Sequence, residues 1–122
     1  MAKAASDAVI DGGLNYIQQN AKRLFVCSAQ PTSYAEASAT YMLAQQTVTS
    51  THFTIGNGDV SGRKIAVSQE SSLSVANSGT ASHVAVCTTA AVMIVTTCTT
   101  QALTTGNTVT VPTWDDEIAD PT

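Results

Sequence analysis

Residues 51–67 read THFTIGNGDVSGRKIAV, and this stretch indicates the fold of the chain. Apolar Phe53 and Ile55 alternate with more polar neighbours, the period of two that is typical of a strand with one buried face. The glycine- and asparagine-rich segment 56–59 can adopt the positive φ that a hairpin turn requires. The alternation resumes at residues 65–67. The stretch therefore predicts two strands joined by a hairpin.

The same pattern continues toward the C-terminus. Turn signals at residues 77–79 (Asn-Ser-Gly) and 106–107 (Gly-Asn) separate further short apolar runs. These runs contain Leu73 and Val75, Val84 and Val86, Val92 to Thr97, and Val109 and Val111. Pro112 ends the last run or places it at a sheet edge, and Trp114 and Ile118 belong to a final short strand. About seven strands spaced about ten residues apart predict an antiparallel β-sandwich or jelly-roll-like barrel.

The N-terminal segment has a different period. From Ser6 to Gln19 the apolar residues recur three to four positions apart, as on one face of a helix. These residues are Val9, Ile10, Leu14 and Ile17. Ser6 is suited to cap the helix and Asn20 to end it. Glycines at 12 and 13 weaken the isolated helix, so it must be stabilised by docking.

After Lys22 the period changes to two. The run Leu24–Cys27 is apolar at every position, which predicts a strand buried on both faces. The next segment, Ala29–Ala44, is expected to be a loop with a short helical turn at Tyr34–Ala37. The sequence thus predicts a single domain over residues 1–122, with an N-terminal arm and helix (1–21) and a β-sandwich (22–122).

The composition is unusually poor in charge. Charged residues make up 11% of the chain, whereas soluble domains usually carry about 25%. Thr, Ser and Ala take their place, which indicates either a tolerant, Thr-rich β surface or a surface that a partner covers.

Nucleic-acid and membrane-spanning functions are not expected. The net charge is −4, and no basic stripe that could neutralise phosphates is present. The longest apolar stretch, Ala90–Val95, is far shorter than the roughly 20 residues that span a bilayer. We also expect no signal peptide, because the N-terminus lacks a continuous apolar region and a cleavage site.

The three cysteines are expected to be free thiols. Cys27, Cys87 and Cys98 cannot all pair within one chain, and no CxxC spacing that suggests a zinc or redox site occurs. Each lies among β-forming residues, where a free cysteine behaves as a small buried hydrophobe. This predicts no bound metal and folding in a reducing cytoplasm.

No constellation of catalytic residues is recognisable, so the chain is not expected to be an enzyme or to bind a cofactor. His52 and His83 are interpreted as strand residues on polar or partly buried faces, since no GxSxG turn accompanies them. Segment 56–64 lacks the register of a phosphate-binding loop and the carboxylates of a calcium site. The acidic residues at 115–117 and Asp120 are expected to form a solvated or interface-facing tail.

Several segments resemble small virion structural proteins of tailed bacteriophages. The segments that carry this resemblance are residues 14–17 (LNYI), 27–37 (CSAQPTSYAEA), 61–64 (SGRK), 79–84 (GTASHV) and 114–118 (WDDEI). Among these proteins the chain is most similar to a capsid decoration, or cement, protein of short-tailed phages. That resemblance implies a jelly-roll-like fold and a place on the outer capsid surface of the virion, after synthesis in the host cytoplasm.

The implied partners are the major capsid protein and other copies of the chain, whose contacts the protein would staple together. The candidate interface residues are Ile10, Leu14, Ile17, Trp114 and Ile118, with Trp114 as the best single anchor. Two alternatives remain open. The protein could be associated with a phage tail, neck or fibre, or it could be a carbohydrate-binding sandwich that uses Trp114 and the tyrosines as an aromatic platform.

Overall fold

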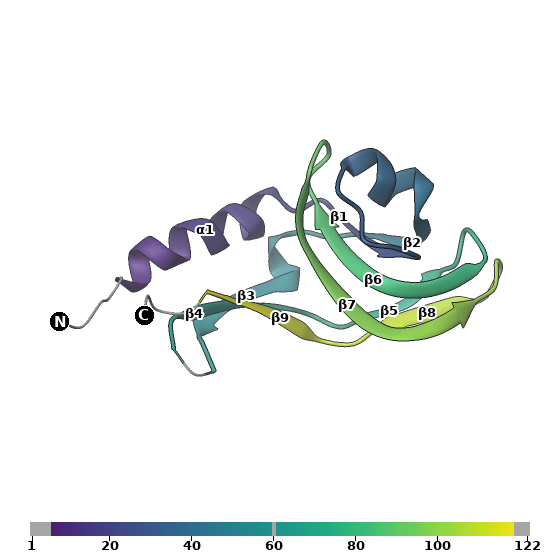
Figure 1. Cartoon of the computed structure of the whole chain (residues 1–122). Coiled ribbons are helices and arrows are strands. Elements are labelled where there is room, and N and C mark those ends of the chain that lie inside the picture. The colour runs from purple at the N-terminus through teal and green to yellow at the C-terminus, as the bar shows by residue number, and fades with distance from the viewer. Residues whose placement is uncertain (1–5, 60, 119–122) are drawn as a thin grey trace.

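The computed structural model describes residues 6–59 and 61–118, and Figure 1 shows their arrangement. Residues 1–5 of the predicted arm and Asp120 of the predicted tail lie outside this described part. The elements are, in chain order, α1 (Asp7–Asn20), β1 (Arg23–Cys27), a π-helical turn η1 (Glu36–Thr40), β2 (Met42–Thr47), a 3₁₀ turn η2 (Ser50–His52), β3 (Phe53–Asn57), β4 (Arg63–Val67), β5 (Glu70–Ser74), β6 (Gly79–Cys87), β7 (Val92–Leu103), β8 (Thr108–Val111) and β9 (Trp114–Ile118).

The fold is mainly β, with antiparallel sheets and one N-terminal helix, as predicted. The largest sheet has the strand order β2-β1-β6-β7. Two smaller sheets, β3-β4-β9 and β5-β8, lie against one face of this large sheet in a sandwich-like arrangement (Figure 1). The sheets do not close into a barrel, so the barrel form of the prediction is wrong.

Strand pairing in this fold is not limited to strands that follow each other in the sequence. β1 pairs with β6, and β4 pairs with β9, so partners far apart in sequence lie side by side. Alternation identifies which residues form a strand, but it carries no information about which strand is the neighbour. The predicted hairpin of β3 and β4 is present, with Phe53 opposite Val67.

β1 is buried on both faces, as its uniformly apolar sequence predicts. Leu24 and Val26 face the main core between the sheets, together with residues of β4, β6 and β8. Phe25 and Cys27 face a second, smaller core on the other side of the large sheet. The ring of Tyr34 covers this second core and meets Phe25 edge to face, with 6.0 Å between ring centroids.

The segment before β2 differs from the expected loop. The helical turn predicted at Tyr34–Ala37 is present, but it extends to Thr40. Residues 42–44, predicted to be part of the loop, and the following residues 45–47 form strand β2 against β1. Their sequence, MLAQQT, lacks a clear period of two, so the strand depends on pairing with β1 rather than on its own pattern.

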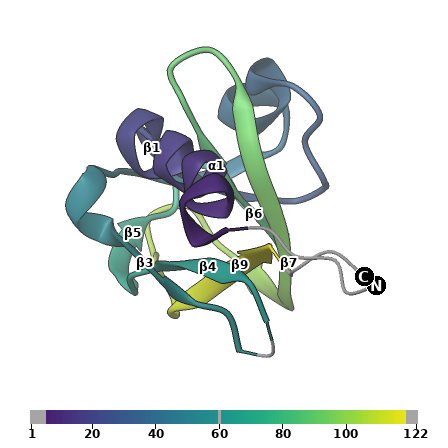
Figure 2. The ribbon, with the colours of Figure 1, turned by 90° about the vertical axis from the view of Figure 1, so that its left-hand side faces the viewer.

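α1 lies over β3 and β4 (Figure 2) and begins and ends close to the predicted bounds. Ser6 caps it by accepting a hydrogen bond from the backbone nitrogen of Val9 at 3.3 Å. Ile10, Leu14 and Ile17 are buried against the sheet. Val9 was predicted to share this face but is 72% exposed. It lies to one side of the row formed by Ile10, Leu14 and Ile17, on the part of the helix surface that faces away from the sheet. No described helix has the length and apolar character needed to cross a membrane.

Two turns depend on glycine. Gly62 (φ 71°) closes the β3–β4 hairpin, where its carbonyl accepts a hydrogen bond from Gly58 at 2.9 Å. Gly106 (φ 95°) lies in the turn from β7 to β8. Positive φ is readily adopted by glycine and is costly for most other residues. Gly106 lies in a predicted turn, but the hairpin turn was predicted at residues 56–59, of which Gly56 and Asn57 belong to β3, and the glycine with positive φ is Gly62.

We expect Leu14→Ala to lower the free energy of unfolding by about 2–4 kcal/mol, because Leu14 is fully buried between α1 and the sheets. Val9→Ala, on the exposed side of the same helix, should change it by about 0.5 kcal/mol or less. Denaturant unfolding followed by circular dichroism measures both. Equal effects of the two substitutions would contradict the docking of α1 described here.

Candidate functional site

The two histidines lie in different surroundings. His52 belongs to the turn η2, not to a strand as predicted, and its Nδ1 accepts a hydrogen bond from the backbone nitrogen of Thr49 at 3.0 Å. Its Nε2 lies 3.5 Å from Oε1 of the buried Glu70. Nδ1 thus closes the turn on itself, and Nε2 faces β5. His83 is a partly buried strand residue, as predicted, beside the Ser82 hydroxyl at 2.7 Å.

The described residues contain no group of three or more His, Cys, Asp or Glu side chains that could hold a metal ion. The acidic segment 115–117 is part of β9, so the prediction of a tail is wrong for these residues. Lys64 bridges it to the β3–β4 hairpin, with Nζ 2.6 Å from Asp59 and 3.3 Å from Asp115. These charges join strands to each other and are not arranged around a cavity.

Asp116 lies on the other face of β9. It pairs in register with Ile65 and lies on the same face of β9 as Trp114 and Ile118, two residues away on either side, so it faces the apolar side of the sheet. Burial raises the pKa of Asp116, and the neighbouring charge of Asp115 raises it further. The ionised carboxylate therefore opposes folding at this position.

We expect Asp116→Asn to raise the melting temperature at neutral pH. Because the pKa of Asp116 is raised in the folded state, its protonated form favours folding. This contribution to the wild-type stability is fully present below the unfolded-state pKa, about 4, and is lost as the pH rises through the folded-state pKa. The gain should therefore vanish near pH 3. Asp115→Asn is the control, because it removes an ion pair with Lys64 and should give no gain. An equal gain from Asp116→Asn at both pH values would contradict this account.

One open side of the sandwich is hollowed. Two adjoining cavities of about 230 and 260 Å³ lie between β6 and β7 on one side and β8 and the start of β9 on the other. We call them together the open-edge cleft. It is lined by Val26, Ala81, Val84, Thr96, Thr97, Cys98, Thr99, Gln101, Val109, Thr110, Val111, Pro112 and Trp114.

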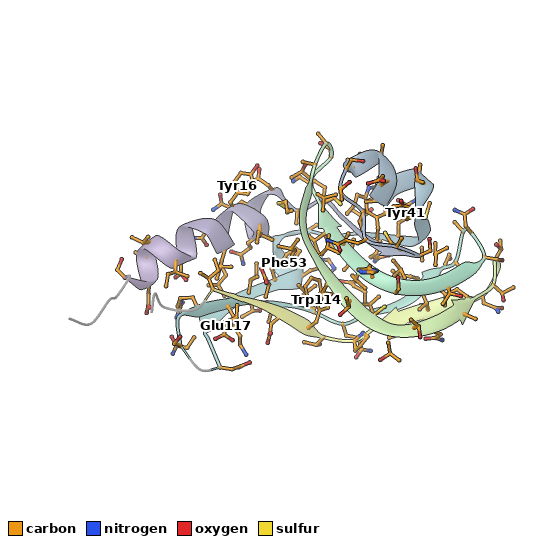
Figure 3. All side chains as sticks on the ribbon, viewed as in Figure 1. Tyr16, Tyr41, Phe53, Trp114 and Glu117 are labelled. Atoms are coloured by element: carbon orange, nitrogen blue, oxygen red, sulfur yellow. The ribbon has the colours of Figure 1, made fainter. Side chains whose placement is uncertain are left out.

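Trp114 lies at one end of the open-edge cleft, where β7 passes β9 (Figure 3). Its ring is half-buried and packs against the main core. Its Nε1 is buried, and it donates no hydrogen bond to any described residue. Buried donors are nearly always paired, so this nitrogen is an unusual feature of the cleft.

The cysteines are free thiols in the structure, as predicted. Burial raises the pKa of Cys27 to about 12, with a further contribution from Cys87, and burial raises that of Cys87 to about 11. Both belong to the second core and are inert at neutral pH. Cys98 is half-buried and lines the open-edge cleft.

We expect a small alkylating reagent at pH 8 to modify Cys98 in the native protein and to leave Cys27 and Cys87 unmodified. Under denaturing, non-reducing conditions all three thiols should react, giving three labels per chain by mass spectrometry. Peptide mapping identifies the labelled residue. Two thiols that resist labelling after denaturation would show a disulfide and contradict the expectation.

The predicted interface residues are placed in different surroundings. Ile10, Leu14 and Ile17 are buried in the chain itself, Trp114 lines the open-edge cleft, and Ile118 is 40% exposed. The structure brings Ile118 to the helix, because a methyl group added at Gly13 would lie 3.8 Å from Ile118 Cδ1. The helix and the end of β9 thus form one surface, although the inward helix residues are not part of it.

The large apolar side chains that are exposed in the described chain are Val9, Tyr16 and Ile118. Val9 and Tyr16 are seven residues apart and lie on one row of α1, with Gly13 between them. We call these three residues and the two glycines, Gly12 and Gly13, the helix patch. Tyr16 points away from the body of the protein (Figure 3) and is 59% exposed. Sequence reasoning missed the patch, although the seven-residue spacing of Val9 and Tyr16 was a signal for it.

Comparison with protein-family models, curated proteins and solved structures finds no match for this chain.

Proposed function

We propose that this protein is a phage virion structural protein that binds the outer surface of the capsid as a decoration protein and stabilises contacts between capsid subunits. The observation that carries the proposal is the helix patch. Its apolar side chains come from α1 and from the end of β9, and Ile118 Cδ1 lies 3.8 Å from the place of a Cβ atom at Gly13. Aromatic and apolar anchors surrounded by neutral surface are typical of protein interfaces.

The geometry of the glycines supports close docking. Open space surrounds the position of a Cβ atom at Gly12, so a partner could approach the helix backbone there. Tyr16 next to it offers a large ring at little cost in conformational entropy. The rest of the chain supplies a surface with few charges to desolvate. Repeated weak contacts of this kind become strong on a lattice of identical subunits.

The alternative roles make different demands. A carbohydrate-binding module uses exposed, flat aromatic platforms, whereas Trp114 is half-buried in the open-edge cleft. A tail, neck or fibre protein would share the fold and the helix patch. Copy number separates that role from decoration: a decoration protein should approach the copy number of the capsid protein, and a tail component should be far rarer. Quantitative mass spectrometry of purified particles decides between them.

The helix patch gives a sharper test. Heads that lack the protein should assemble but rupture at a lower temperature, and added wild-type protein should restore them. Gly12→Arg should abolish binding to such heads, because the new side chain occupies the space left open at the helix surface. Tyr16→Ala should weaken binding about 10-fold or more.

Gly12→Ala is the matched control. It replaces the same glycine, improves helix propensity, and leaves room for the partner, so it should bind heads like the wild type. Thermal unfolding of each free variant shows that the fold is intact. Full binding by folded Gly12→Arg protein would contradict a docking role for the helix patch. Failure of the wild-type protein to bind heads would contradict the capsid proposal itself.

A further inference from the structure

The guanidinium of Arg63 binds two elements at once. Its Nε and Nη2 hold the carboxylate of Asp11 in α1, at 2.8 and 3.2 Å. Its Nη1 donates a hydrogen bond of 2.7 Å to Oδ1 of Asn57, the last residue of β3. Because a guanidinium can only donate, the amide oxygen of Asn57 faces Arg63 and the amide nitrogen faces away from it. The amide of Asn57 is therefore held in one orientation beside a positive charge.

Asn57 is also the one asparagine of the chain that precedes a glycine. The other four precede Tyr16, Ala21, Ser78 and Thr108. The backbone nitrogen that follows an asparagine can attack its amide carbon, and such an intramolecular attack gains from the proximity of the two groups. A side chain on the following residue shields this nitrogen, whereas Gly58 leaves it open.

The fold requires a glycine at position 58. A Cβ atom there would lie 2.5 Å from Oε1 of Glu117 and closer still to the carbonyl oxygen of Ser61. A side chain at this position would thus displace the backbone of the hairpin turn. The shape of the hairpin therefore keeps the reactive neighbour next to Asn57.

We propose that Asn57–Gly58 is a modification site at which the folded chain deamidates, with Arg63 assisting. The nitrogen of Gly58 gives up its proton to water and attacks Cγ of Asn57. The bond from Cγ to Nδ2 breaks, ammonia leaves, and a succinimide ring remains. Water then opens the ring at one of its two carbonyls and leaves aspartate or isoaspartate at position 57. Arg63 assists because its hydrogen bond stabilises the negative charge that develops on Oδ1 during the attack.

One contact opposes the reaction. The nitrogen of Gly58 donates a hydrogen bond to the carbonyl of Gly62 at 2.9 Å, and this bond must open before the attack. Asn57 and Arg63 form the last pair of the β3–β4 ladder, and the ends of such ladders open at a small cost in free energy. Asn57 is exposed, so water reaches it. Opening of the hairpin tip therefore precedes a slower chemical step, and both contribute to the rate.

The products change the contacts of Arg63. Aspartate at position 57 gives Arg63 a second carboxylate beside Asp11 and adds one negative charge to the net charge of −4. Isoaspartate adds a methylene group to the backbone, so position 57 can no longer pair in register with Arg63. Both products act at the contact that joins α1 to β4. The inference does not depend on a role in phage particles.

The test ages the intact protein at pH 8, below its unfolding temperature, and maps its peptides by mass spectrometry. Asn57 should convert about 10-fold or more faster than Asn77 and Asn107, which are also exposed but precede larger residues. Water labelled with heavy oxygen should place the label in the product at position 57, as opening of a succinimide requires. Ion exchange should resolve the product as a more acidic form.

Two variants separate the role of Arg63 from that of the hairpin. Arg63→Met removes the hydrogen bonds to Asn57 and Asp11 and keeps an unbranched side chain, so it should slow the conversion about 5-fold or more. Asp11→Asn is the matched control, because it removes the same ion pair and leaves the bond from Arg63 to Asn57 in place. It should convert at the wild-type rate. Thermal unfolding verifies that each variant is folded.

Three outcomes would overturn the proposal. The first is that Asn57 stays intact while Asn77 or Asn107 converts. The second is that Arg63→Met converts as fast as Asp11→Asn, which would remove the role of Arg63. The third is conversion in denaturant with none in the native protein, which would assign the reaction to the unfolded chain. Head binding by freshly prepared protein remains a separate readout of the capsid proposal.

Discussion

Strand β1 is the constraint on which the rest of the structure depends. Both of its edges are paired, with β2 and with β6, and both of its faces are buried. Leu24 and Val26 require a layer of apolar residues on one side, which β4, β5 and β8 supply. Phe25 and Cys27 require a cover on the other side, which Tyr34 and the turn η1 supply. Removing either layer would expose apolar surface in the centre of the large sheet.

This double burial also explains why the protein has an open side. The turn η1 and Tyr34 cover the outer face of β1, and α1 covers the sheet β3-β4-β9 (Figure 2). Nothing in the described chain remains to cover the free edge of β7 or the space between β7 and β8. The bulge at residues 98–100 limits regular pairing along this edge, as bulges do at the edges of many sheets.

The parts of the fold that follow from local chemistry were predictable from the sequence. The apolar run of β1, the alternation of β3 and β4, and the cap of α1 at Ser6 each have a local signature. The pairing of β1 with β6 and the existence of β2 do not, because they depend on contacts between distant residues. The sequence was equally unable to show which residues contact a partner protein. An apolar helix face at Ile10, Leu14 and Ile17 has one sequence pattern whether it meets its own sheet or a partner.

The few charges of the chain are concentrated where elements must be joined without much apolar surface. Arg63 makes a two-pronged ion pair with Asp11, with Nε 2.8 Å from Oδ1 and Nη2 3.2 Å from Oδ2, which fixes α1 to β4. Lys64 joins the hairpin to β9. β7, in contrast, is uncharged from Val92 to Leu103. Charge that joins the chain's own elements is therefore separated from this neutral edge strand.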